Sequence, residues 1–268
     1  MQILFIYHSC FAVVTDTMVL VFDYWKDHPD GRLQHLLANR GDRQLFFVVS
    51  HFHEDHFNPD ICNIEGARLL VSYDTAKRRH VKGDNVDAIL RPDDTFSNDF
   101  FTLHALRSTD VGISSLLSLP DGTTIYHAGD NNNWYFLDND EAPAAGTDAA
   151  GDTQNTEAPA DTENLDVAMQ AKANAARTIH CSLKEMEGLF LAIVRAVRKL
   201  TPQVDHVMFP VDPRLGKETL RGVGQWLWNI KTANLYPMHC WERWTEVDSA
   251  IAKLRESFPE VNIHYPLP

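Results

Sequence analysis

The sequence predicts an α/β fold of the α+β kind, and three observations support this prediction. The first half of the 268 residues is a series of short β-rich runs separated by polar breaks. The second half alternates helical and strand patterns. A cluster of histidines and carboxylates at residues 51–56 directly follows a continuous apolar run. This length suits a single domain covering residues 1–268, with room for a sizeable core.

The first half contains the first group of expected strands. Three runs open the chain, from Ile3 to Tyr7, from Phe11 to Val14 and from Met18 to Phe22. A short helix is expected from Arg32 to Asn39, and the apolar run from Gln44 to Ser50 is typical of a strand buried on both faces. Further strands are expected at Arg68 to Ser72, Asp87 to Leu90, Phe100 to Leu106, Ile113 to Leu119 and Thr123 to Tyr126.

The second half has a different period. From Leu183 to Leu200 the apolar residues recur on one helical face, which predicts an amphipathic helix. A strand is then expected from Val204 to Phe209, a helix from Leu220 to Ile230 and a strand from Leu235 to Met238. A last helix is expected at Glu242 to Ser257.

Residues 138–164 interrupt this pattern. They are rich in Ala, Asp, Glu, Thr, Pro and Gly and almost free of large apolar side chains. Nine acidic residues and no Lys or Arg lie between Asp138 and Asp166, so the rest of the chain carries −13 + 9 = −4 of the formal charge. This composition predicts a mobile acidic insertion, with a lid over a site as the functional alternative.

Charge and composition exclude several classes of protein. The chain lacks the basic surface that a phosphate backbone needs, so nucleic acid is not an expected partner. Apolar runs stay well short of the roughly 20 residues that span a bilayer, and the N-terminus reads as a strand rather than a signal peptide. The four cysteines form no C-x-x-C pair, which favours reduced thiols and a cytoplasmic location.

Residues 51–56 carry the clearest chemical signal. They read His-Phe-His-Glu-Asp-His and place three imidazoles and two carboxylates within six positions. These groups suit Zn, Fe or Mn, and a short loop after a rigid strand can hold them converging. His51 and His53 can point to one side, so Asp55 and His56 can turn toward a second ion. An idle polar surface loop is the alternative, but a buried strand is a poor place to attach one.

Three motifs make the chain resemble the metallo-β-lactamase superfamily. H-x-H-x-D-H after a strand is similar to the defining motif of that superfamily. Tyr126 to Asp130 resembles its strand ending in Gly-Asp, and Tyr236 to His239 resembles the late strand that supplies the last histidine. The openings Tyr7 to Phe11 and Val21 to Asp23 resemble the branch of ascorbate-6-phosphate lactonase and N-acyl-phosphatidylethanolamine phospholipase D. The resemblance covers all but the acidic segment and implies a four-layer αββα sandwich.

The resemblance also implies a site for two divalent metal ions, which are either Zn, or else Mn or Fe. In this arrangement one aspartate bridges the ions, and Asp55 additionally accepts the proton of the nucleophile. The first ion would be held by His51, His53 and Asp110, the second by Asp55, His56 and His239, and the bridge would be Asp130.

Asp110 marks a departure from the family pattern. Members usually have another metal-binding histidine well before the bridging aspartate, but Leu106 to Gly112 contains none. An uncharacterised bacterial group resembles the chain here, with Ser-Thr-Asp at this point and His-Ala-Gly-Asp-x-Asn-x-Trp later. Asp110 is therefore the candidate replacement ligand. His104 is a weaker substitute, and a turn cap is the alternative role for Asp110.

Other residues are candidates for supporting the ligands or contacting substrate. They lie near the predicted motifs or at the rim formed by strand ends. These candidates are His8, Asp23, His127, Trp134, Asp212 and Arg214. Ordinary packing is the alternative for His127 and Trp134, and a local Asp–Arg turn is the alternative for Asp212 and Arg214.

A metal-dependent hydrolase acting on a small ester, lactone or phosphoester is the function that these features predict. The substrate is expected to be a small molecule, with an anionic one as an option, and the oligomeric state is left open. A metal-dependent nuclease or phosphodiesterase is one alternative, although the acidic charge argues against it. A metal-binding or sensing protein with a degenerate site is another. A di-iron redox protein would usually need a flavin domain, for which the chain is too short.

Overall fold

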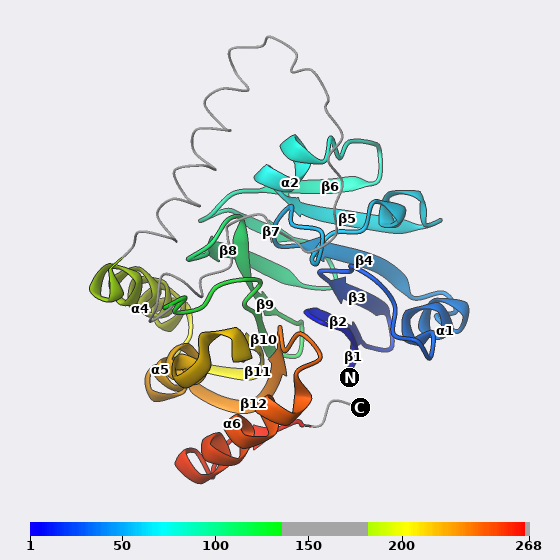
Figure 1. Ribbon diagram of the computed structural model, residues 1–268. Coiled ribbons are helices and arrows are strands. Elements are labelled where there is room, and N and C mark those ends of the chain that lie inside the picture. Colours follow the sequence, from blue (N-terminus) through cyan, green and yellow to red (C-terminus); the bar gives the residue numbers. More distant parts are fainter. Residues whose placement is uncertain (136–181, 266–268) are drawn as a thin grey trace, which may run out of the picture.

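The computed structural model describes residues 1–135 and 182–265, and these form two sheets that face each other (Figure 1). The first sheet has the order β1-β2-β3-β4-β5-β6. Strands β1 to β3 pair antiparallel, whereas β3 to β6 pair parallel. Its strands are β1 (Gln2–Tyr7), β2 (Cys10–Val14), β3 (Met18–Phe22), β4 (Gln44–Val49), β5 (Ala67–Ser72) and β6 (Val86–Leu90).

The second sheet has the order β13-β12-β11-β10-β9-β8-β7. Strands β7 to β10 pair antiparallel, whereas β10 to β13 pair parallel. Its strands are β7 (Thr95–Ser97), β8 (Thr102–Arg107), β9 (Ile113–Ser118), β10 (Thr124–His127), β11 (Gln203–Pro210), β12 (Lys231–Met238) and β13 (Asn262–Ile263).

Helices cover the outer faces of both sheets and complete four αββα layers (Figure 1). The first sheet is covered by α1 (Arg32–Ala38), η1 (Pro59–Asn63) and α2 (Tyr73–Arg78). The second sheet is covered by α4 (Leu183–Leu200), α5 (Arg221–Asn229) and α6 (Trp244–Ser257). A further turn, η2 (Pro213–Glu218), follows β11. The predicted four-layer sandwich is therefore confirmed.

Strand β4 shows how the sequence produces these layers. Phe46 and Val48 belong to the core between the sheets, whereas Leu45 and Phe47 pack toward α1 and η1. Because successive side chains of a strand point to opposite faces, a strand covered on both sides must be apolar throughout. The continuous apolar run of the sequence is the signature of that position.

The expected elements agree with the structure where both exist, and the differences are short elements. Helix α2, turns η1 and η2 and the edge strands β7 and β13 were not expected, because none is long enough to show a period. Strand β12 begins four residues before the expected start at Leu235. The expected acidic insertion at 138–164 lies outside the described residues. Within the described residues, no helix is both long and apolar enough to cross a membrane.

Candidate metal centre

The centre is built from loops that follow strand ends. Residues 51–56 follow β4, Asp130 follows β10 and His239 follows β12. Asp110 lies in the connection from β8 to β9, and His8 lies in the turn from β1 to β2. Short connections on buried strands fix the backbone from which each side chain projects, so the side chains can converge in one place.

Two glycines let these loops pack against the end of β4. Gly112 has φ of 73°, and a Cβ atom there would lie 2.1 Å from the Ser50 carbonyl oxygen and 2.6 Å from the His51 Cβ atom. Gly129 has φ of 52°, and its Cβ atom would lie 2.8 Å from the Ser50 side chain. The β8–β9 loop and the β10 loop therefore reach the histidine cluster only because a side chain is missing at each position.

One group of four side chains surrounds a common point. His51, His53, Asp110 and Asp130 each offer one ligand atom, and these atoms lie within 4.8 Å of one another. His51 Nε2 is 3.1 Å from His53 Nδ1 and 3.4 Å from Asp130 Oδ2. Asp110 Oδ2 lies 3.8 Å from His53 Nδ1. The structure thus places Asp110 beside the two histidines with which the sequence associated it.

A second group of four side chains lies next to the first. It consists of His8, Asp55, His56 and His239, whose ligand atoms again lie within 4.8 Å of one another. Asp55 Oδ2 is 3.2 Å from His8 Nε2, 3.5 Å from His239 Nε2 and 3.6 Å from His56 Nε2. The sequence suggested a supporting role for His8, whereas the structure places its Nε2 atom among the candidate ligand atoms.

Asp130 lies between the two groups. Its Oδ2 atom is 3.4 Å from His51 Nε2. Its Oδ1 atom is 3.0 Å from His56 Nε2 and 3.4 Å from His239 Nε2. The side chain is buried. A buried carboxylate that presents one oxygen to each group is in the position required to bridge two ions.

Two further carboxylates hold the outer nitrogens of two candidate ligands. His56 Nδ1 donates to Asp23 Oδ2 at 2.8 Å, and His239 Nδ1 donates to Asp212 Oδ2 at 2.9 Å. Both aspartates are fully buried. The Ser50 backbone N–H donates to Asp23 Oδ1 at 2.7 Å, and its hydroxyl donates to Asp23 Oδ2 at 2.6 Å. The surrounding carboxylates raise the pKa of both histidines, to about 9 for His239, so a bound ion would displace the proton at Nε2 while Nδ1–H keeps its bond to the aspartate.

The carboxylates of the centre differ in their pKa values. Burial raises the pKa of Asp110, and the neighbouring Asp130 carboxylate raises it further, to about 6. Burial also opposes the ionisation of Asp55 and Asp130, but the nearby His56 imidazole holds the pKa of both well below the ordinary value. These two aspartates are therefore ionised at neutral pH and attract a cation.

The side chains present fit a pair of metal ions. Among the described residues, His8 Nε2, His56 Nε2, His239 Nε2 and Asp130 Oδ1 are buried without a hydrogen-bond partner. Leaving buried polar atoms unpaired is costly, and here they all face one point. Imidazole nitrogens and carboxylate oxygens are ligands of Zn, Fe and Mn. A cation in the second group would satisfy these atoms, and the donor set of the first group offers the same kinds of ligand.

Two histidines considered from the sequence lie outside both groups. His127 Nε2 donates to the Ser9 carbonyl at 2.8 Å, and its Nδ1 accepts the Gly129 N–H at 3.1 Å. Both ring nitrogens are thus occupied, and the imidazole supports the β10 loop. His104 Nδ1 lies 3.0 Å from the Thr95 hydroxyl on the neighbouring strand, so it does not substitute for Asp110.

Trp134 and Arg214 form hydrogen bonds with aspartates of the centre. The buried Trp134 indole donates from Nε1 to the Asp130 backbone carbonyl at 2.7 Å. Arg214 Nε lies 3.0 and 2.9 Å from the two oxygens of Asp212, and its Nη2 lies 2.6 Å from one of them. The guanidinium also lies 4.5 Å above the Trp241 ring. Arg214 therefore forms the local Asp–Arg turn that the sequence allowed as its alternative.

Sequence reasoning missed two residues that border the centre. Ser50 Oγ is 2.9 Å from His51 Nδ1, and the Trp241 ring centroid is 4.6 Å from that of His8. The only sequence signal for each was its place next to a candidate ligand, Ser50 directly before the histidine cluster and Trp241 two residues after His239. Adjacency of this kind does not show which way a side chain points.

The chain matches known proteins in structure but not in sequence. No family model and no curated protein matches this chain. Igni18, a metallo hydrolase from the hyperthermophilic archaeon Ignicoccus hospitalis KIN4/I, matches with a TM-score of 0.57 and 15% identity, over 97% of this chain and 92% of that one. The chain has a metallo-β-lactamase fold.

A second solved structure is similar to this metallo-β-lactamase fold. CmlA, a diiron beta-hydroxylase from Streptomyces venezuelae, matches with a TM-score of 0.56 and 11% identity. The match covers 97% of this chain but 52% of CmlA, so the chain spans about half the length of that protein. At these identities the similarity concerns the fold, and the chemistry must be argued from the centre itself.

Proposed function

We propose that the chain is a metal-dependent hydrolase with a dinuclear centre that acts on a small ester, lactone or phosphoester. The observation that carries the proposal is that Asp130 faces two adjacent groups of candidate ligands, one with each oxygen. The similarity of the fold to a metallo hydrolase supports the same class of reaction. Within the centre, His51, His53 and Asp110 would hold one ion, Asp55, His56 and His239 would hold the other, and Asp130 would be placed to serve both.

The residues of the chain supply orientation and proton transfer. A pair of divalent ions, when bound, supplies an activated water and a Lewis acid for a carbonyl or phosphoryl oxygen. Asp55 is ionised at neutral pH, and its carboxylate would be available to accept a proton there. Asp23 and Asp212 keep the imidazoles of His56 and His239 in one tautomer and one orientation.

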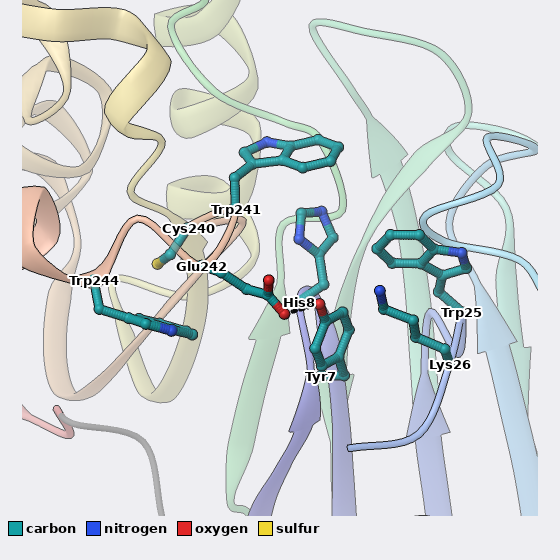
Figure 2. A pocket seen from close by; sticks show the side chains of 8 residues that line it. All are labelled: Tyr7, His8, Trp25, Lys26, Cys240, Trp241, Glu242 and Trp244. Carbon is teal, nitrogen blue, oxygen red and sulfur yellow. Dashed lines mark hydrogen bonds between the residues drawn. The ribbon is translucent and has the colours of Figure 1, made fainter. Parts of the chain in front are cut away.

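A pocket beside the second group supports a small substrate. The pocket has a volume of about 150 Å³, and His8 forms part of its wall (Figure 2). Such a volume accepts roughly one small ring. The Lys26 ammonium lies 4.2 Å from the centroid of the Trp25 ring and 4.4 Å from that of Tyr7, where it would meet an anionic substituent. We therefore favour a compact, anionic substrate over a nucleic acid.

The proposal is tested by metal analysis followed by a substrate panel. The full chain, purified without added metal, is expected to contain up to two equivalents of Zn, Mn or Fe. Small lactones, thioesters and phosphodiesters are then assayed with the metal-loaded protein and with the Asp130→Asn variant. We expect hydrolysis of at least one class by the wild type, with a loss of at least about 100-fold in the variant. Failure to bind any of these metals would exclude the proposal.

Oxidation at two iron ions is the second candidate function. The similarity to a diiron beta-hydroxylase favours it, together with the first group, which contains two histidines and two carboxylates. Oxygen-rich ligand sets lean toward Fe or Mn rather than Zn. Protein expressed with iron would then bind two iron ions and consume dioxygen with a reductant. Hydrolysis by the zinc-loaded protein, without iron, would instead favour the first proposal.

A further inference from the structure

We propose that His8 is a direct ligand of the second ion through its Nε2 atom. This assignment rests on the metal centre proposed above. It adds a residue from the turn between the first two strands to that centre. The imidazole projects from the β1–β2 turn, and its Nε2 atom lies 3.2 Å from Asp55 Oδ2. Three imidazoles, those of His8, His56 and His239, would then share this ion with Asp55.

The distances around Asp55 match the edges of a coordination polyhedron. Atoms bound about 2.0–2.2 Å from one metal ion lie roughly 2.8–3.6 Å apart, depending on the coordination number. Asp55 Oδ2 lies 3.2 Å from His8 Nε2, 3.5 Å from His239 Nε2 and 3.6 Å from His56 Nε2. The His8 atom is therefore placed at least as well for coordination as the two histidines that the sequence motifs already indicate.

A simple hydrogen bond does not explain the position of His8. A charge-assisted N–H···O bond is typically about 2.7–2.9 Å long. The His8–Asp55 pair, at 3.2 Å, is at the long end of the N–H···O range, and His8 Nε2 is buried without a hydrogen bond of good geometry among the described residues. The Nε2 atoms of His56 and His239 share this condition. A cation between the three nitrogens and Asp55 satisfies all of them at once.

The backbone holds His8 in this place at a conformational cost. His8 has φ of 54° and His239 has φ of 60°, values that side-chain-bearing residues rarely adopt. The His239 N–H donates to the His8 carbonyl at 3.3 Å and ties the two turns together. The rings of Trp25 and Trp241 contact the imidazole at centroid distances of 5.6 and 4.6 Å (Figure 2). Strain of this kind is typical of functional sites.

The assignment makes the two halves of the centre chemically different. With His8, the second group has three imidazole nitrogens and one unshared carboxylate, whereas the first has two imidazoles and Asp110. Nitrogen-rich sites suit Zn, and oxygen-rich sites lean toward Mn or Fe. The second group should therefore retain Zn²⁺ while the first exchanges it for Mn²⁺ more readily.

The experiment is a metal titration of the full-length protein. Metal-free wild type and His8→Ala are titrated with Zn²⁺ and, in parallel, with Co²⁺, whose absorption bands report its ligands. In the variant, one of the two binding steps should weaken by roughly 100-fold or more, beyond the about 10–100-fold typical of losing an outer hydrogen-bonding partner. Added imidazole should fill the vacated space and restore both the Co²⁺ bands and the occupancy, without altering the wild type.

Two further variants distinguish the loss of a ligand from other effects of substituting a histidine. His8→Gln retains a donor for Asp55 but no imidazole, so it should behave like His8→Ala. His206→Ala removes a half-buried imidazole that contacts Tyr236 away from the centre, and it should keep both binding steps. Unchanged binding in His8→Ala, or wild-type binding in His8→Gln, would overturn the assignment. A wild type that binds metal and hydrolyses substrate would leave the proposed function intact in either case.

Discussion

At the scale of single residues, the centre depends on carboxylates that do not reach the candidate ions themselves. Asp23 and Asp212 each accept a hydrogen bond from the outer nitrogen of one histidine. Such partners fix the tautomer and raise the basicity of the ligand. Arg214 in turn holds both oxygens of Asp212, so the orientation of His239 depends on a chain of three side chains.

Asp212→Asn should therefore weaken metal binding without removing a ligand. We expect the affinity for the second ion to fall by about 10–100-fold, because the neutral amide no longer matches His239 and Arg214. Calorimetric titration of the metal-free protein measures the change. Asp205→Asn is the matched control, since Asp205 accepts two hydrogen bonds from Thr124, both at 2.9 Å, away from the centre. Equal affinities in the two variants would contradict the argument.

Asp110 decides whether the first group is complete. Asp110→Ala should lower the occupancy of the first ion and leave the second in place, because the two groups have no residue in common and Asp110 belongs to the first alone. Asp110→His replaces an oxygen ligand by nitrogen and should shift the preference from Mn or Fe toward Zn. Metal analysis after dialysis checks both variants. Two full equivalents and unchanged turnover in Asp110→Ala would leave Asp110 as a turn residue.

Protonation of Asp110 also gives the first ion a pH dependence. The pKa of this carboxyl in the metal-free protein is raised to about 6, first by burial and then by Asp130. Below that pH the group holds a proton, which an incoming ion must displace. The affinity for the first ion should therefore fall as the pH drops through about 6. Titrations across this range should show a shallower slope for Asp110→Asn, and parallel slopes would count against a ligand role.

At the scale of elements, the centre needs two loops to pass unusually close to the end of β4. Gly112→Ala combines a positive φ of 73° with a contact of 2.1 Å to the Ser50 carbonyl. We expect a loss of about 3 kcal/mol or more in the free energy of unfolding, together with loss of metal. Gly41→Ala is the control, because Gly41 has φ of 61° but nothing within 4 Å of its Cβ position.

The control should lose only about 1–2 kcal/mol, the cost of the left-handed backbone alone. Urea unfolding of both variants and of the wild type measures the difference. A Gly112→Ala protein as stable as Gly41→Ala would show that the β8–β9 loop can move away from Ser50. The centre would then be more adaptable than its packing indicates.

Elements with a clear period were predictable, and those without one were not. Helix α4 follows from apolar positions that recur on one face, and β4 follows from its uninterrupted apolar run. Helix α2 has six residues and β13 has two, and segments this short do not complete a recognisable pattern. Their positions follow from tertiary packing, which a single sequence does not reveal.

The centre was predictable to the extent that its residues follow strands in motifs. Residues 51–56, Asp130 and His239 were named from sequence, and the structure brings them together. His8 was named from sequence as a residue that supports the ligands or contacts substrate, but its place among the candidate ligand atoms was not predictable, because it depends on a left-handed backbone in the β1–β2 turn. The position of Trp241 depends on the same kind of conformation, with φ of 51°. Local strain of this kind leaves no signal in residue type.

At the scale of the molecule, fold and chemistry rest on different evidence. A TM-score of 0.57 at 15% identity shows that very different sequences produce the same layers. Continuous apolar runs in the strands and apolar faces on the helices are enough to specify two covered sheets, and many sequences satisfy that requirement. The proposed chemistry depends instead on a small set of side chains at one edge, so substitutions at individual positions can test it without changing the fold.

The last prediction concerns residues 138–164, which lie outside the described part of the chain. Their composition offers too little apolar surface to offset the entropy of ordering them. The candidate ligands named above, and the core that supports them, lie in residues 1–135 and 182–265. Replacing the segment by a short Gly-Ser linker should therefore leave the melting temperature and the metal content nearly unchanged.

Thermal unfolding and metal analysis of the shortened chain distinguish three outcomes. One or two kcal/mol lowers the melting temperature of a protein this size by only several degrees, so a drop of more than about 10 °C would mean that the segment contributes to the folded core. Unchanged stability with lost turnover would assign it to the site as a lid. Unchanged stability, metal content and turnover would confirm an acidic insertion that carries most of the net charge of the chain, without a part in the core or the centre.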